Sequence, residues 1–297
     1  MTENSTSRKA LYLRKLFEIL AAHPDGIQAK EALAKLEERV TLTDHERGRL
    51  ESGAQRFEKA VRFTSIPAVK AGWLVKTKGI WFVTEAGQKA MAEYRSPDEF
   101  LRAARRLYRE WKKAQPTSRD ADEGELEESD AEEAASITFE KAEEQAWEEI
   151  ETYLRKMPPY EFQEMVADLL RAIGYHVSWV APPGKDGGID ILAWTDPLGT
   201  RPPRIKVQVR RVTSPISVEG LRSFMSVLGN DDVGLFVSTG GFTKDAAQEA
   251  RTQENRKITL VDLDRLFDLW VEHYGKLTDA ARQRLPLRPL YFLSLQA

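Results

Sequence analysis

Three polar residues in the C-terminal half of the chain have types and a spacing that imply a particular chemistry. Asp190 lies in a short apolar run, residues 189–194, and Gln208 and Arg210 lie in a second run, residues 205–210. Because residues two apart on a strand point to the same face, Gln208 and Arg210 share one side of that strand. A carboxylate, an amide oxygen and a cation at one sheet edge suit a metal-dependent phosphodiester hydrolase. The oxygens hold Mg²⁺, which prefers oxygen ligands. The metal activates water, and the cation stabilises the charge that develops on the phosphate.

Two strands and the loop between them must position these side chains. Residues 189–194 predict a buried strand after the turn Gly187-Gly188, and residues 196–199, Asp-Pro-Leu-Gly, predict a turn. Residues 205–210 alternate apolar and polar side chains, which predicts a second strand. The same residues also allow a structural interpretation. Asp190 could cap the turn, and Gln208 and Arg210 could lie on the solvated face of an edge strand.

The sequence around these residues resembles a known nuclease family. Gly187-Gly188-Ile189-Asp190, then residues 207–211 (VQVRR) and residues 240–244 (GGFTK), are similar to the catalytic domain of Mrr-type restriction endonucleases. The resemblance covers about residues 158–266. It implies a PD-(D/E)xK fold, in which helices flank a small mixed sheet, and in this branch the second acid is usually Gln, as it is here.

The resemblance also implies a set of site residues. The Asp190 carboxylate, the Gln208 side-chain oxygen and the Val209 carbonyl would hold Mg²⁺, with Mn²⁺ as a substitute. Glu161 matches an acidic residue that related nucleases carry on the first helix of the domain, although Glu164 and Asp168 lie on the same predicted helix.

One residue departs from the family pattern. The family has Lys where this chain has Arg210. Arg keeps the positive charge, but its guanidinium is planar, bulkier and permanently protonated. The resemblance therefore predicts the fold more firmly than it predicts cleavage. The neighbouring Arg211 alternates to the opposite face of the strand and is a poor substitute.

The N-terminal part predicts a second domain with a DNA-binding layout. Helical periodicity in residues 9–22, 28–37 and 54–71 precedes a predicted hairpin, residues 73–83, and a final helix. This order is typical of a winged helix, and residues 9–94 also resemble the N-terminal domain of Mrr-type proteins. Winged helices place one helix in the major groove and the wing on the backbone. The candidate DNA contacts are Arg56, Lys59, Arg62, Lys76 and Lys78. An ordinary solvated helix face and a dimerisation surface are the alternatives.

An acidic segment separates the two predicted domains. Residues 120–152 contain fifteen acids and one base, so this segment has a net charge of −14 within a chain of net charge −3, and the remainder carries +11. Two basic units suit a polyanionic partner.

We expect an α/β protein with a winged-helix domain at residues 1–96. A basic helix, an acidic linker and a connecting helix follow at 97–157, and the nuclease domain occupies 158–297. Residues 120–133 could also mimic the phosphates of nucleic acid and hold off DNA.

Several classes of protein are disfavoured by the composition. The chain has no Cys, which excludes disulfides and thiolate zinc sites and agrees with a cytoplasmic location. The sequence has no apolar run of membrane-spanning length, and it has no Gly-rich phosphate-binding motif of the ATPase type, so neither a membrane nor a nucleotide cofactor is expected.

Three functions remain at this point. The first is a Mg²⁺-dependent restriction endonuclease that cuts foreign, modified double-stranded DNA as a homodimer or larger homo-oligomer, since cutting both strands requires two sites. The second is a DNA-binding sensor in which Arg210 has replaced catalysis. The third is a protein-interaction adaptor, which the +11 charge outside the acidic segment disfavours.

Overall fold

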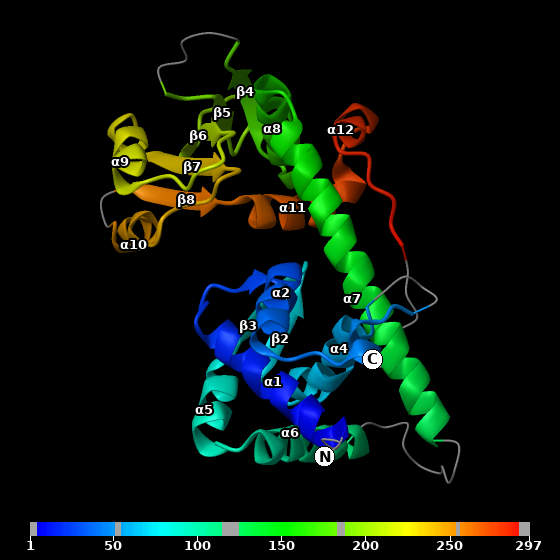
Figure 1. Cartoon of the computed structure of the whole chain (residues 1–297). Coiled ribbons are helices and arrows are strands. Elements are labelled where there is room, and N and C mark those ends of the chain that lie inside the picture. The colour runs from blue at the N-terminus through cyan, green and yellow to red at the C-terminus, as the bar shows by residue number, and fades with distance from the viewer. Residues whose placement is uncertain (1–4, 51–54, 115–124, 183–187, 254–255, 291–297) are drawn as a thin grey trace. The chain divides into compact units, whose positions relative to one another are not determined.

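The computed structural model describes residues 5–50, 55–114, 125–182, 188–253 and 256–290, with side chains described outside 125–135 (Figure 1). The chain divides into two compact units. The first unit extends to Glu149 and the second begins at Ile150. We describe each unit separately.

The first unit contains a helical bundle followed by a hairpin. Its helices are α1 (Ser5–Ala21), α2 (Ala29–Arg39), α3 (Asp44–Arg47), α4 (Arg56–Lys70), α5 (Glu85–Glu93) and α6 (Pro97–Lys113). Its strands β1 (Ile27–Gln28), β2 (Leu74–Thr77) and β3 (Ile80–Val83) form an antiparallel sheet in the order β1-β3-β2. Lys78 and Gly79 both have positive φ, 47° and 75°, as a two-residue hairpin turn requires. The predicted winged-helix layout is therefore present.

Helix α6 belongs to the core of the first unit. Its buried residues Phe100, Leu101, Ala103 and Ala104 lie in the same hydrophobic cluster as residues of α1, α2 and α4. The rings of Phe17 and Phe100, for example, meet edge to face at 4.9 Å between centroids. The first unit thus extends past residue 96, where we placed the domain boundary, because the apolar face of α6 completes the core. Helix α4 contains Pro67 within its length.

Helix α7 (Glu125–Lys156) runs through the junction between the two units. The predicted linker is shorter than expected, since helix replaces it from Glu125 onward. Residues 125–135 are rich in Glu and Ala. The helix propensity of these residues outweighs the repulsion between their negative charges. The proposed phosphate-mimicking segment, residues 120–133, lies partly outside the described residues, and the side chains in the rest of it are not described.

The second unit is a mixed sheet flanked by helices. The strands are β4 (His176–Val180), β5 (Ile191–Trp194), β6 (Arg204–Arg210), β7 (Asp232–Ser238) and β8 (Lys257–Val261), in the order β4-β5-β6-β7-β8. The helices are α8 (Pro159–Ile173), α9 (Val218–Ser226), α10 (Lys244–Thr252), α11 (Leu263–Glu272) and α12 (Asp279–Arg284), with a 3-10 turn, η1 (Tyr274–Lys276), before α12.

Strand β6 occupies the centre of this sheet. It pairs antiparallel with β5, in the register Ile191 to Val207, and parallel with β7, in the register Gln208 to Phe236. Helices α9 and α10 cover Phe236 of β7, and α8 packs on β4, β5 and β6. This arrangement confirms the predicted fold class. Among the described residues, no helix combines the length and apolarity needed to cross a membrane.

Candidate active site

Asp190 lies where the β5 ladder ends beside β6. Its N–H donates to the Val207 carbonyl at 2.8 Å, and its own carbonyl accepts the N–H of Ala181 at 2.8 Å. Its carboxylate is buried, and Oδ2 accepts the N–H of Val209 at 2.7 Å. The side chain therefore satisfies a backbone donor of β6. A carboxylate offers about four acceptor positions.

Gln208 is the second buried polar side chain at this edge. Its Nε2 donates to the carbonyl of Gly188 at 3.1 Å, which leaves Oε1 as the acceptor of the amide. In a strand, the N–H and C=O of one residue point to the same side. The Val209 carbonyl therefore points toward the Asp190 side of β6, together with the N–H that binds Asp190. The structure thus brings Asp190, Gln208 and Val209 together.

Arg210 is exposed at the end of β6. None of the ion pairs between described residues involves it. Arg211 turns elsewhere, since its Nη1 donates to the Arg155 carbonyl at 2.8 Å. Lys206 shares the Gln208 face, but its Nζ lies 2.8 Å from Asp232 Oδ2 and 2.6 Å from the Val227 carbonyl. Arg210 is therefore the cation beside Gln208 that remains available.

Asp232 holds Lys206 at the opposite end of β6 from Arg210. Burial alone would raise the pKa of Asp232, but hydrogen bonds from Arg204 and Lys206 outweigh burial and lower this pKa well below its ordinary range. The charged cluster is therefore structural, because its cations are already neutralised.

The first helix of the domain presents a different polar residue from the one we predicted. Glu161 is exposed in the first turn of α8, and no contact among the described residues joins it to Asp190 or Gln208. Gln163 is buried instead, and its Nε2 donates to the Ala181 carbonyl at 2.8 Å. Ala181 in turn donates its N–H to the Asp190 carbonyl. The face of α8 that buries Phe162 and Val166 also buries Gln163.

The donor atoms fit a hard cation. One carboxylate, one amide oxygen and one carbonyl oxygen are the ligand types that Mg²⁺ and Mn²⁺ accept. Within the part of the chain that the structure describes, no group of three or more His, Cys, Asp or Glu side chains could hold a metal. The protein thus offers a site of low negative charge, in which substrate phosphates and water would supply further oxygens.

The predicted DNA contacts lie in the first unit, and one of them is buried. Arg62 is 2 % exposed. Its guanidinium contacts Glu58 of its own helix at 3.1 Å and Glu140 and Glu144 of α7, the latter at 2.9 Å. Burial opposes the charge on Arg62, yet Glu140 and Glu144 raise its pKa above the ordinary value. Arg62 is therefore an ion-pair partner of α7, and its assignment as a DNA contact is wrong for this conformation.

Lys76 on the wing is also occupied. Its Nζ lies 3.0 Å from Glu140 Oε2 and 4.0 Å from the centre of the Trp81 ring, and its side chain is 6 % exposed. Burial lowers the pKa of Lys76 to about 8, against the opposing effect of Glu140. Lys78 lies 5.0 Å from the centre of the Trp147 ring of α7. The wing thus packs against α7 through its cations.

The remaining two predicted contacts are more accessible. Arg56 is half-buried at the start of α4, and Lys59 is exposed with its Nζ 5.5 Å from the centre of the Phe63 ring. The sequence missed the α7 partners because Glu140 and Glu144 are 78 and 82 residues away from Arg62. Local periodicity carries no information about such a pairing.

Comparison with known proteins places the chain in a family. Residues 154–270 match the family described as "Restriction endonuclease" (Mrr_cat), and residues 11–93 match the family described as "Mrr N-terminal domain" (Mrr_N). The chain is 25 % identical over 281 residues to the type IV methyl-directed restriction enzyme EcoKMrr of Escherichia coli (strain K12), covering 88 % of this chain and 91 % of that protein.

A solved structure, the MspJI restriction endonuclease in complex with a 27-mer oligonucleotide, is 17 % identical with a TM-score of 0.31. That match covers 65 % of this chain and 45 % of the MspJI chain. The two family matches stand in the predicted order and together cover more than half of the chain. The protein therefore belongs to the Mrr-type restriction endonucleases, with a catalytic domain of the PD-(D/E)xK class.

Proposed function

We propose that this protein is a metal-dependent DNA endonuclease of the type IV restriction class, which hydrolyses phosphodiester bonds in foreign, modified double-stranded DNA. The observation that carries the proposal is the placement of Asp190 beside Gln208 and Val209 of the central strand β6. The similarity to a methyl-directed restriction enzyme supports modified DNA as the substrate.

In this proposal each residue has one task. Asp190, the Gln208 Oε1 and the Val209 carbonyl would hold Mg²⁺ or Mn²⁺, which when bound lowers the pKa of water and screens phosphate charge. The bond from Gln208 Nε2 to the Gly188 carbonyl fixes the amide and leaves Oε1 as its acceptor atom. Gln163 donates to the Ala181 carbonyl, and the Ala181 N–H donates to the Asp190 carbonyl. Gln163 is therefore a positioning residue for Asp190.

Arg210 would stabilise the negative charge that develops on the scissile phosphate. An arginine side chain, unlike that of lysine, does not serve as a general base. A planar cation can contact two phosphate oxygens at once. We infer that Arg210 positions the phosphate, and that a homodimer or larger homo-oligomer brings a second site to the opposite strand.

The same residue favours a second candidate function. If the compact ammonium of Lys is required beside the attacking water, the Arg210 protein binds DNA without cutting it and acts as a DNA-binding sensor. Exposure of Arg210 at the strand end suits contact with a DNA backbone equally well.

Cleavage of modified and unmodified plasmid and phage DNA, with Mg²⁺ or Mn²⁺, separates the two. We compare the protein with Asp190→Asn, which keeps an acceptor for the Val209 N–H, and with Arg210→Lys. Metal-dependent cutting that disappears in Asp190→Asn supports the endonuclease. Cutting by the Arg210→Lys variant alone shows that the protein is a nuclease whose activity is impaired by Arg210. DNA binding without cutting by any of the three proteins refutes the endonuclease and supports the sensor.

A further inference from the structure

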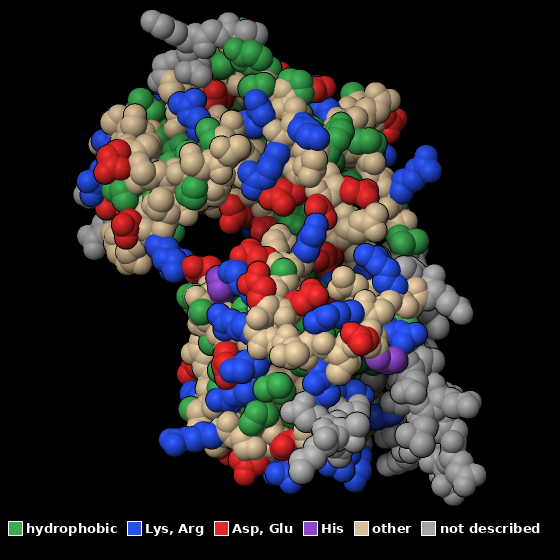
Figure 2. Space-filling model, viewed as in Figure 1, with side chains coloured by type: hydrophobic (Ala, Val, Ile, Leu, Met, Phe, Trp, Pro, Cys, Tyr) green, Lys and Arg blue, Asp and Glu red, His purple; other side chains and the backbone are tan. Residues whose placement is uncertain are grey.

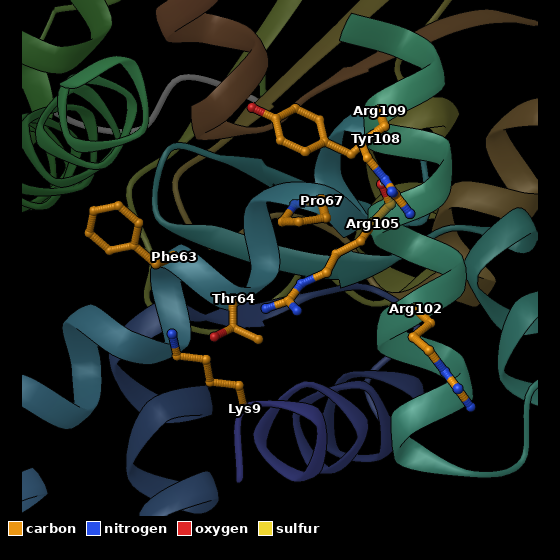
Figure 3. A pocket seen from close by; sticks show the side chains of 8 residues that line it. All are labelled: Lys9, Phe63, Thr64, Pro67, Arg102, Arg105, Tyr108 and Arg109. Carbon is orange, nitrogen blue, oxygen red and sulfur yellow. The ribbon is translucent and has the colours of Figure 1, made fainter. Parts of the chain in front are cut away.

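A cavity of about 590 Å³ lies in the first unit between α1, α4 and α6. It is lined by Lys9, Phe63, Thr64, Pro67, Arg102, Arg105, Tyr108 and Arg109, which we call the α6 cleft (Figure 3). Arg105 extends from α6 across the cleft toward Thr64 and Lys9 (Figure 3). This volume falls in the range of small-ligand sites, about 300–1,000 Å³, and accommodates a nucleotide.

The lining is cationic and carries no carboxylate. Within the described part of the chain, Arg102 and Arg109 donate to backbone carbonyls of their own helix, Asp98 at 3.3 Å and Arg105 at 3.4 Å. Among the described residues, no ion pair involves Lys9 or any of the three arginines of the lining. Four cations that line one cleft, with no acidic partner among the described residues, raise the local concentration of anions.

Aromatic rings accompany the cations. Phe63 and Tyr108 line the cleft, and Tyr108 stacks on Trp111 at 5.9 Å between centroids with 18° between planes. Lys70 lies 4.5 Å from the centre of the Trp111 ring, which holds this pair in place. Cations that track a backbone, combined with rings that contact bases or sugars, are the means by which proteins bind nucleic-acid strands.

The cleft also contrasts with the surface that we first predicted to bind DNA. On that surface Arg62 and Lys76 are neutralised by α7, whereas the cations of the α6 cleft remain open to an external anion. Figure 2 shows Lys and Arg side chains at many positions on the visible face of the first unit, with acidic side chains between them. Charge alone therefore does not single out the cleft. The absence of lining carboxylates and the presence of rings do so.

We propose that the α6 cleft binds consecutive phosphates of a DNA strand, with Arg105 and Lys9 on the phosphates and Phe63 and Tyr108 against the sugar or base. The assignment of the anion as DNA rests on the proposed function. The cleft, rather than the α4 and wing cations covered by α7, is then the entry point for DNA in this conformation.

The test measures binding of labelled duplex and single-stranded DNA by the full chain carrying Asp190→Asn, so that binding is read without cutting. One variant combines Lys9→Gln, Arg102→Gln and Arg109→Gln, all exposed positions, and a second is Arg105→Gln. The matched control combines Arg39→Gln, Lys89→Gln and Arg95→Gln, which removes the same charge from exposed positions outside the cleft.

We expect the cleft triple variant to weaken binding about tenfold or more at roughly 0.1 M salt, and to flatten the dependence of log K on log salt by about 2 to 3. Arg105→Gln weakens binding in the same direction, and the control changes it much less. Phe63→Leu lowers affinity about fivefold or more if a base or sugar contacts the ring.

Equal losses in the cleft and control variants, unchanged binding in the cleft variants, or no DNA binding by the Asp190→Asn protein would each overturn the proposal. Displacement of DNA by a deoxynucleoside monophosphate would assign the cleft to a free nucleotide and overturn it as well. A failure of this proposal can be distinguished from a failure of the proposed endonuclease activity, because a protein that never cuts DNA can still lose DNA binding through these variants.

Discussion

Replacement of Arg62 by Met tests whether this residue holds the first unit together or binds DNA. Its side chain is 3 % exposed and contacts three carboxylates, those of Glu58, Glu140 and Glu144, whose side chains are 16–27 % exposed. Removing one partner of a buried ion pair costs about 3–5 kcal/mol, because the remaining charges stay buried without compensation. The partial exposure of the carboxylates places this loss near the lower value, about 3 kcal/mol. For a unit of this size, that is a fall in Tm of roughly 10 °C.

The assay is scanning calorimetry of the full chain, combined with hydrogen exchange of α4 and α7. We expect a lower first transition and faster exchange in both helices. A compensated variant, Arg62→Met with Glu144→Gln, recovers most of the loss, since Glu140 keeps Lys76 as its partner and Glu58 keeps Lys141. Unchanged stability together with a large loss of DNA affinity in Arg62→Met would refute the structural role and restore the recognition role.

Three further predictions follow from the buried ionisable groups. The unfolded chain keeps the Lys76 proton up to about its ordinary pKa of 10.5, whereas the folded protein loses it near pH 8. Stability therefore rises with pH across this window, and Lys76→Met removes the rise in urea titrations. The lowered pKa of Asp232 stabilises the fold above its ordinary value of 3.8, and this stabilisation disappears as the pH falls. Asp232→Asn is therefore less stable at pH 7 but loses less on acidification, as acid-unfolding curves followed by circular dichroism will show. Asp190→Ala costs about 1–3 kcal/mol more than Asp190→Asn because it orphans the Val209 N–H, and urea midpoints measure this difference.

The strands of the second unit could be predicted because their residues carry local signals. The alternation from Ile205 to Arg210 defines β6 and places Gln208 and Arg210 on one face. The apolar run before the turn at Asp196 defines β5, and the short spacing between the two runs makes them neighbours. The juxtaposition of Asp190 with Val209 follows from that pairing and so was accessible from the sequence.

Other features depend on contacts between distant parts of the chain. The burial of Arg62 and Lys76 requires Glu140, and nothing in the local pattern of α4 or the wing points to it. The choice between Glu161 and Gln163 depends on how α8 is rotated against the sheet. A first-turn Glu looks functional by charge, but packing turns Gln163 toward the strands.

The bond between Asp190 and the Val209 N–H has a consequence for how such a protein changes during evolution. Selection for folding alone retains a hydrogen-bond acceptor at position 190, even in a lineage that no longer cuts DNA, because its loss orphans a buried donor. Arg210 is exposed at a strand end, and its side chain makes no comparable hydrogen bond among the described residues. Loss of cleavage by drift is therefore expected to begin at position 210 and to leave Asp190 in place. If Arg210 acts as we propose, the residue at 210 in relatives of this protein reports on activity, whereas a hydrogen-bond acceptor at 190 reports on the fold.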